Sequence, residues 1–134
     1  QVVVAAGGGG IPVRRDGNAL NGAAAVVDKD FASAVLADII DADFLIILTA
    51  VEKVAVNFRK PDEKWLDTLT PEAAQKYCDE GQFAPGSMLP KVQAAMQFAQ
   101  SKPGRKALIT LLEKAEDGLD GKTGTVMSQE SDRR

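Results

Sequence analysis

The chain has 134 residues, the length of one typical domain, and its 45% hydrophobic and 26% charged residues predict a folded globular protein. Nineteen acidic residues against sixteen basic ones give a net charge of −3, which argues against nucleic-acid binding as the main function. Histidine is absent, which excludes Ser-His and Cys-His catalysis and histidine-ligated metals. The single cysteine, Cys78, excludes an internal disulfide and is typical of a reducing compartment.

The first residues predict a strand rather than a targeting signal. Residues 2–6 form an apolar, β-branched run typical of a strand buried on both faces, and they lack the basic region of a signal peptide. No segment approaches the ~20 consecutive apolar residues of a membrane helix, so no membrane span is expected. A chain that opens inside a strand is expected to be part of a longer protein.

The first half of the chain predicts strands around one helix. Apolar residues recur at helical spacing from Phe31 to Ile39, and Asp30 is the expected N-cap of that helix. The other expected elements, in chain order, are a strand over residues 2–6, a glycine turn over 7–10, a hairpin tip over 14–18, a strand over 23–27, a buried strand over 44–48 that ends at Thr49, and an extended segment over 54–58.

The second half predicts helices that flank a further strand. Thr70, Pro71 and Glu72 combine a capping hydroxyl, a first-turn proline and an acid, and so predict the start of a helix that ends at Gly81. The remaining elements are expected to be a helix opened by Pro90 and broken at residues 102–104, a strand over 107–112, a short helix over 113–118, an edge strand over 124–126 and a polar tail over 128–134.

This order of elements predicts an α/β layered domain with a mostly parallel sheet flanked by helices. In such sheets ligands bind outside the carboxyl ends of the strands. The loops expected to carry a site are therefore the ones that follow strands, at residues 7–10, 28–30 and 49–53.

Lys29 is the first candidate for chemistry, because it stands between two acids at the positive end of a predicted helix. A cation is misplaced there unless an anion binds beside it, and a helix start with an adjacent ammonium is typical of phosphate sites. Asp30 would both cap the helix and hold the lysine. The alternative is a solvated surface cluster of charges with no ligand.

Lys91 repeats this pattern in the first turn of the helix opened by Pro90, and two such lysines could grip the phosphates of one nucleotide. Alternatively, Lys91 points to solvent. The glycine run at residues 7–10 permits close approach of a ligand but is not a Walker motif, and residues 121–125 lack the spacing of a phosphate loop and predict a turn. Trp65 and Phe83 are expected to be packing residues.

Three segments, residues 26–37, 48–54 and 81–92, closely resemble carbamate kinase, a family with the amino acid kinase fold. Residues 7–13 and 121–126 fit the same pattern in the same order. The resemblance covers residues 1–127, whereas the family's chains are more than twice as long. It therefore implies that residues 1–127 are the C-terminal, nucleotide-binding lobe of a carbamate kinase-like protein.

The resemblance implies reversible phosphoryl transfer between carbamoyl phosphate with ADP and carbamate with ATP, assisted by Mg²⁺. It further implies a cytoplasmic homodimer that serves arginine or purine-nitrogen catabolism. Lys29 and Lys91 correspond to the lysines that bind the phosphoryl groups, and Asp30 to the residue that organises them. No metal ligand is assigned. The nucleotide-binding positions implied are Gly8, Gly9, Lys29, Thr49, Ala55, Phe83, Pro85, Gly86, Met88 and Lys91.

The sequence also departs from the family, because Ala55 stands where many members carry an aromatic residue and Ala50 where many carry an acid. The N-terminal half that supplies the carbamoyl side is absent, so the chain alone is expected to bind nucleotide weakly without turnover. Alternatives are another kinase of this fold, of the acetylglutamate or uridylate type, a non-catalytic nucleotide-binding module, or a degenerate fragment that folds only in part.

Overall fold

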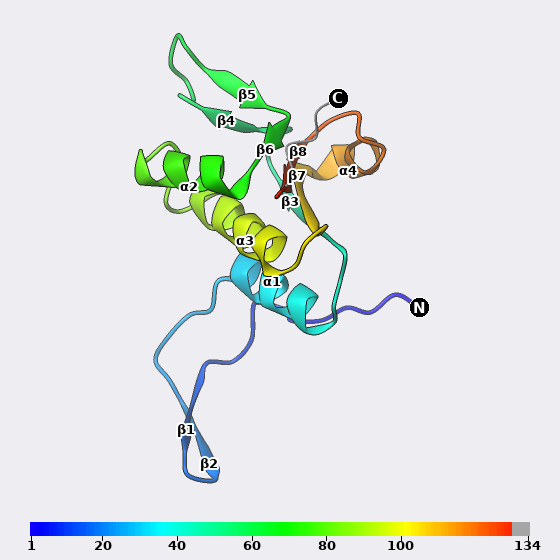
Figure 1. Cartoon of the computed structure of the whole chain (residues 1–134). Coiled ribbons are helices and arrows are strands. Elements are labelled where there is room, and N and C mark those ends of the chain that lie inside the picture. Colours follow the sequence, from blue (N-terminus) through cyan, green and yellow to red (C-terminus); the bar gives the residue numbers. More distant parts are fainter. Residues whose placement is uncertain (130–134) are drawn as a thin grey trace.

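The computed structural model describes residues 1–129, and their centre is a four-stranded mixed sheet with helices packed on it (Figure 1). The strands lie in the order β3 (Phe44–Thr49), β7 (Lys106–Leu111), β8 (Thr125–Ser128), β6 (Thr68–Leu69). β3 pairs with β7 and β6 with β8 in parallel, whereas β7 and β8 are antiparallel. The predicted α/β layering is confirmed, with one antiparallel step inside the sheet.

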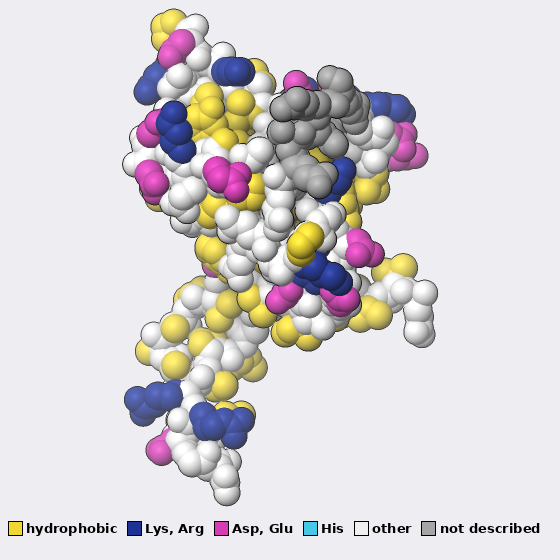
Figure 2. All heavy atoms as spheres, in the orientation of Figure 1, with side chains coloured by type: hydrophobic (Ala, Val, Ile, Leu, Met, Phe, Trp, Pro, Cys, Tyr) yellow, Lys and Arg dark blue, Asp and Glu magenta, His cyan; other side chains and the backbone are white. Residues whose placement is uncertain are grey.

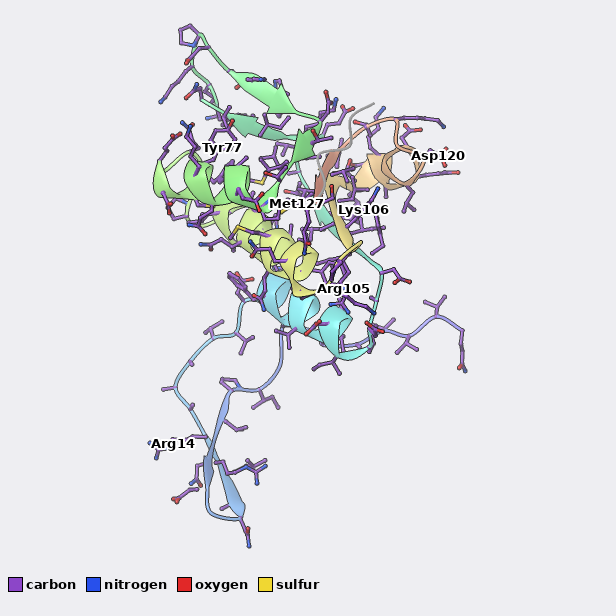
Figure 3. The ribbon with its side chains drawn as sticks, viewed as in Figure 1. Arg14, Tyr77, Arg105, Lys106, Asp120 and Met127 are labelled. Carbon is purple, nitrogen blue, oxygen red and sulfur yellow. The ribbon has the colours of Figure 1, made fainter. Side chains whose placement is uncertain are left out.

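Three helices form a layer around α3 (Met88–Ser101), the helix that covers most of this sheet; the other two are α1 (Lys29–Ile39) and α2 (Pro71–Asp79). α3 lies against β7 and β8, and both α1 and α2 pack on α3. Small side chains permit the close approach, since Ala34 and Ala37 of α1 and Ala94, Ala95 and Ala99 of α3 are all buried. In Figure 3 the labelled Met127 of β8, whose side chain is fully buried, lies beside α3.

Two smaller pairs of strands extend from this body. β1 (Val13–Asp16) and β2 (Ala19–Gly22) form the predicted hairpin, which projects away from the helices (Figure 1). β4 (Val54–Val56) and β5 (Lys64–Leu66) form an antiparallel ribbon next to α2. The extended segment at β4 was predicted, whereas β5 and β6 were not. A short 3-10 turn, η1 (Leu112–Lys114), leads into α4 (Ala115–Leu119).

Several local predictions are confirmed by the helix ends. Thr70 Oγ1 accepts a hydrogen bond from the Ala73 N–H, and Pro71 begins α2 as expected. Gly81 follows its C-cap. α3 begins at Met88, two residues before the proline that was expected to open it. No helix of the described residues is long and apolar enough to cross a lipid bilayer.

Two predicted strands are wrong, and so is the prediction that the last strand lies at the edge of the sheet. Residues 2–6 and 23–27 are not strands, and Val2 and Val4 are 96% and 97% exposed. A strand buried on both faces requires a neighbouring strand to pair with and other elements packed on both faces. No described strand pairs with either segment. β8 is not an edge strand, because it lies between β7 and β6.

The cap of α1 is also different from the prediction. Asp28, not Asp30, is the N-cap, and its Oδ1 accepts the N–H of Asp30 at 2.8 Å and that of Phe31 at 3.4 Å. The Asp30 side chain is thereby free to reach α3. Ser128, the first residue of the expected polar tail, ends β8, and the Gln129 side chain donates to the Ala99 carbonyl. The rest of that tail, residues 130–134, lies outside the described residues.

Arg105 ties the end of α1 to the end of α3 (Figure 3). Its side chain is only 4% exposed, and it pairs with the carboxylates of Asp38 and Asp41 and donates to the Ser101 hydroxyl at 2.6 Å. Its guanidinium also lies 5.0 Å from the centre of the Phe98 ring. This buried cation therefore fixes the loop between α1 and β3, from which the sheet begins.

We predict an acid-sensitive contribution from this cluster. Lys102 and then Arg105 hold the pKa of Asp41 below its ordinary value of 3.8. A lowered folded pKa stabilises the fold above 3.8, and this stabilisation is lost as pH falls through the lowered pKa. Asp41→Asn should therefore lower the urea midpoint at about pH 6 but much less at about pH 2.5. Asp16→Asn, on the exposed hairpin, is the control, and an equal loss at both pH values would contradict the prediction.

Candidate functional site

A cleft of about 440 Å³ opens where β3 ends. Its walls are residues 49–53 after β3, the β4–β5 ribbon with its connecting loop, and residues 81–88 between α2 and α3. Figure 2 shows hydrophobic side chains gathered over β4 and β5, the elements that form one of these walls. The carboxyl end of a parallel strand is the expected position for a ligand site in such a sheet. The described residues therefore contain a cleft of ligand size at that position.

Four of the predicted nucleotide-binding residues line this cleft: Thr49, Ala55, Phe83 and Met88. Two more, Pro85 and Gly86, lie in the exposed loop between the lining residues Ala84 and Ser87. Phe83 is 4% exposed and meets Tyr77 edge-to-face, as expected of a packing residue.

Hydrogen bonds join the walls of the cleft. The Asn57 N–H, at the end of β4, donates to Gln82 Oε1 at 2.9 Å, which connects the ribbon to the segment after α2. Thr125 Oγ1 accepts the N–H of Val54 at 2.8 Å and donates to the Leu66 carbonyl at 2.6 Å, so one buried hydroxyl binds both strands of the ribbon. Both walls are thus tied to the folded core.

The closing segment has a structural role next to these bonds. Thr123 and Thr125 are buried, and the Thr123 hydroxyl bonds the Glu52 carboxylate. Gly121 and Gly124 have positive φ values in the turn that leads into β8. Residues 121–125 are therefore the predicted turn that enters a strand.

Lys53 and Asn57 line the cleft within the segment, residues 49–58, that the resemblance implies for the nucleoside pocket, whereas Lys60 and, in its exposed position, Trp65 were missed by sequence reasoning. Lys53 pairs with Asp67 across the base of the ribbon. Trp65 was expected to be a packing residue, yet it is 44% exposed. The position of Trp65 could have been predicted from residues 64–69, which favour a β-strand. Because this segment follows a polar loop, it is expected to return antiparallel to β4.

The starts of α1 and α3 lie side by side, joined by an ion pair. Lys91 Nζ lies 2.8 Å from Asp30 Oδ2, and the two side chains are 16% and 15% exposed. Lys29 precedes Asp30 in sequence and is exposed. Asp30 therefore stands between the two predicted lysines, next to one along the chain and bonded to the other in space.

The two helix starts differ in how their positive ends are compensated. Asp28 caps α1, and Asp30 lies in its first turn. The N-cap of α3, Ser87, makes no side-chain capping bond, and the first turn of α3 has no acid. Ser87 also lines the cleft. The Leu89 N–H donates to the Ala84 carbonyl at 3.0 Å and Pro90 has no N–H, so an anion in the cleft would meet the positive dipole end of α3 rather than a full set of free N–H groups.

Gly8 and Gly9 lie elsewhere, in the segment that precedes the hairpin. Gly9 has φ 112° and lies against Val27, where an added Cβ would come within 3.0 Å of the Val27 carbonyl oxygen. Gly9 borders a shallow apolar groove along α1 rather than the cleft. Among residues 1–129, no three acidic or sulfur-bearing side chains gather as a metal site.

The chain matches the model of the amino acid kinase family over residues 1–110. The carbamate kinase-like protein YqeA of Escherichia coli is 64% identical over 129 residues, which are 96% of this chain and 42% of that protein. Carbamate kinase of Clostridium perfringens is 55% identical over 124 residues, which are 92% of this chain and 40% of that protein. The chain thus spans about two fifths of the length of these relatives.

The fold is also similar to solved structures. Carbamate kinase from Giardia lamblia bound to AMP-PNP matches with a TM-score of 0.85 and 42% sequence identity, over 90% of this chain and 38% of the Giardia chain. Nine tenths of this chain therefore has the same fold as part of a longer protein that was solved with a nucleotide analogue bound.

Proposed function

This chain belongs to the amino acid kinase family, and on that premise we propose that it forms the nucleotide-binding part of a carbamate kinase. The complete enzyme would transfer a phosphoryl group reversibly between carbamoyl phosphate with ADP and carbamate with ATP. Relatives named carbamate kinase at 47–55% identity support this substrate class. Residues 1–127 are assigned to the nucleotide-binding lobe.

The observation that carries the proposal is the position of the cleft beside the start of α3. Met88 lines the cleft, and Lys91 follows it by three residues on the same helix, so the two are neighbours on one helix face. An adenine nucleotide fits this arrangement, with its base between the apolar walls and its phosphates beside the start of α3, near Lys91. Thr49, at the end of β3, lies on the same rim.

The proposed chemistry suits the residues present. Phosphoryl transfer depends mainly on positioning and on neutralising charge, and carbamate is already an anion that needs no general base. Lys91 and Lys29 would neutralise phosphate oxygens, while Asp30 holds the Lys91 ammonium in place through their 2.8 Å contact. A chain without histidine can perform these roles.

Mg²⁺ is part of the proposal as a partner of the nucleotide. It retains several waters and binds through substrate phosphates with one or two carboxylates, so it requires no cluster of protein ligands. When bound, Mg²⁺ would supply further neutralisation of phosphate charge. A cytoplasmic homodimer in arginine or purine-nitrogen catabolism completes the proposal.

The test compares the chain alone with a hybrid enzyme, in which this chain replaces the matched 124 residues of the Clostridium perfringens relative. We expect no ATP formation from carbamoyl phosphate and ADP by the chain alone, because about three fifths of the relatives' length is missing. The hybrid should form ATP, as measured by a coupled luminescence assay.

The outcomes separate the alternatives. ATP formed by the chain alone would show that the site is complete without the remaining length. A hybrid that binds ADP without turnover would favour a non-catalytic nucleotide-binding module. A hybrid that phosphorylates acetylglutamate or uridylate in preference to carbamate would assign the chain to another kinase of this fold.

A further inference from the structure

Trp65, the one tryptophan in the chain, lies in the wall of the cleft. In the β4–β5 ribbon it stands directly opposite Ala55, and directly opposed residues of an antiparallel pair share one face. Both line the cleft, whereas the next pair, Val54 and Leu66, is buried on the other face. The cleft face of the ribbon thus carries a large flat ring beside a methyl group.

The indole of Trp65 is held but not covered. Phe58 meets it at 6.0 Å between ring centres and an interplanar angle of 86°, and a perpendicular ring occupies at most one face of the indole. The guanidinium of Arg59 lies 5.3 Å from the centre of the Phe58 ring and steadies this neighbour. Trp65 nevertheless remains 44% exposed, although the surrounding walls include Phe83 and Met88. A fixed ring with exposed surface inside a cleft is a suitable platform for a planar ligand.

We propose that Trp65 is the surface on which the nucleotide base stacks, and that the small Ala55 opposite it leaves the room the base requires. This rests on the proposed function and names the residue that holds the base. Stacking on an aromatic side chain requires only the flat face of a base. Trp65 therefore supplies affinity for the base but does not discriminate between bases by the polar groups on their edges. Trp65 is thus a binding residue for the base, and the phosphates remain with the lysines.

The experiment uses the chain itself and two probes, ADP and inorganic tripolyphosphate, which carries phosphates without a base. Because Trp65 is the sole tryptophan, its emission reports directly on the proposed contact. ADP should quench the emission, whereas tripolyphosphate should bind with little change in it. Calorimetry gives the affinities of variants that lack the indole.

Trp65→Ala should weaken ADP binding about 5- to 100-fold and leave tripolyphosphate binding unchanged. Trp65→Phe, which keeps a flat ring, should remain within about threefold of the parent. Leu112→Ala is the matched control, because Leu112 is a large apolar residue, 60% exposed, on η1 outside the cleft. It should change neither affinity.

Each outcome decides the proposal. Equal ADP affinity of Trp65→Ala and the parent would overturn the stacking role and leave the proposed function intact. If the parent bound neither probe, the proposed function would fall together with this inference. If Trp65→Ala failed to fold, quenching of the parent by ADP but not by tripolyphosphate would support the proposal, and absence of quenching would overturn it.

Discussion

Lys91→Met in the hybrid enzyme is expected to lower kcat for ATP formation by about a hundred- to a thousandfold. Lys91 is held by Asp30 at the start of α3, one helical turn from the cleft, and in the proposed reaction it would neutralise the charge that develops on the transferred phosphoryl group. Methionine keeps most of the apolar stem and removes only the ammonium. The measurement is steady-state kinetics with carbamoyl phosphate and ADP.

The contribution of the Lys91–Asp30 ion pair to stability can be separated from the proposed role of Lys91 in phosphoryl transfer. Lys91→Met leaves the largely buried Asp30 carboxylate without its partner, which also lowers stability. The double variant Lys91→Met/Asp30→Asn removes the unpaired charge and should regain stability in urea unfolding, but not activity. If the double variant regained activity as well, Lys91 would serve the fold rather than the phosphates.

The largest stability effect in this chain is expected from Gly124→Ala, a loss of roughly 3 kcal/mol in the free energy of unfolding. Gly124 has φ +88°, and an added Cβ would lie 2.5 Å from Leu108 Cδ1 and 3.1 Å from Thr110 Cβ. Leu108 and Thr110 are fully buried in β7, so neither side chain can move aside into solvent. Urea unfolding measured by far-UV circular dichroism gives the value.

Gly104→Ala is the matched control for backbone strain. Gly104 has φ +84°, almost the same conformation, but an added Cβ would meet no atom within 4 Å. It should lose only about 1 kcal/mol, and the difference between the two variants measures overpacking against β7. Equal losses would mean that the space beside Leu108 can expand.

The elements that could be predicted from sequence are those whose signals are local. Thr70 and Pro71 fix the start of α2 through a capping bond and a backbone angle, which depend on a few neighbouring residues. The hairpin of β1 and β2 follows from turn residues in the same way. Residues 2–6 were misjudged because burial depends on what packs against a segment, which the segment itself does not encode.

The candidate site was predictable in part for the same reason. Lys91 and Asp30 stand out by their places at helix starts, but their contact depends on how α1 and α3 pack, which is a tertiary property. Trp65 was assigned to packing because its exposure depends on the pairing of β5 with β4 across a polar loop. Local sequence signals thus identify the candidate residues. Which of these residues line the same wall of the cleft depends on strand pairing.

The hydroxyl of Thr125 has a consequence for how this wall can move. Because it bonds one residue of each ribbon strand, Val54 and Leu66, both strands are anchored through one hydroxyl to β8, an inner strand of the sheet. The base of the ribbon must therefore travel with the sheet, while the bond from the Asn57 N–H to Gln82 ties the other end of β4 to the segment after α2. A wider opening of the cleft would then require the Asn57–Gln82 bond to break while the Thr125 hydroxyl keeps the base of the ribbon in place.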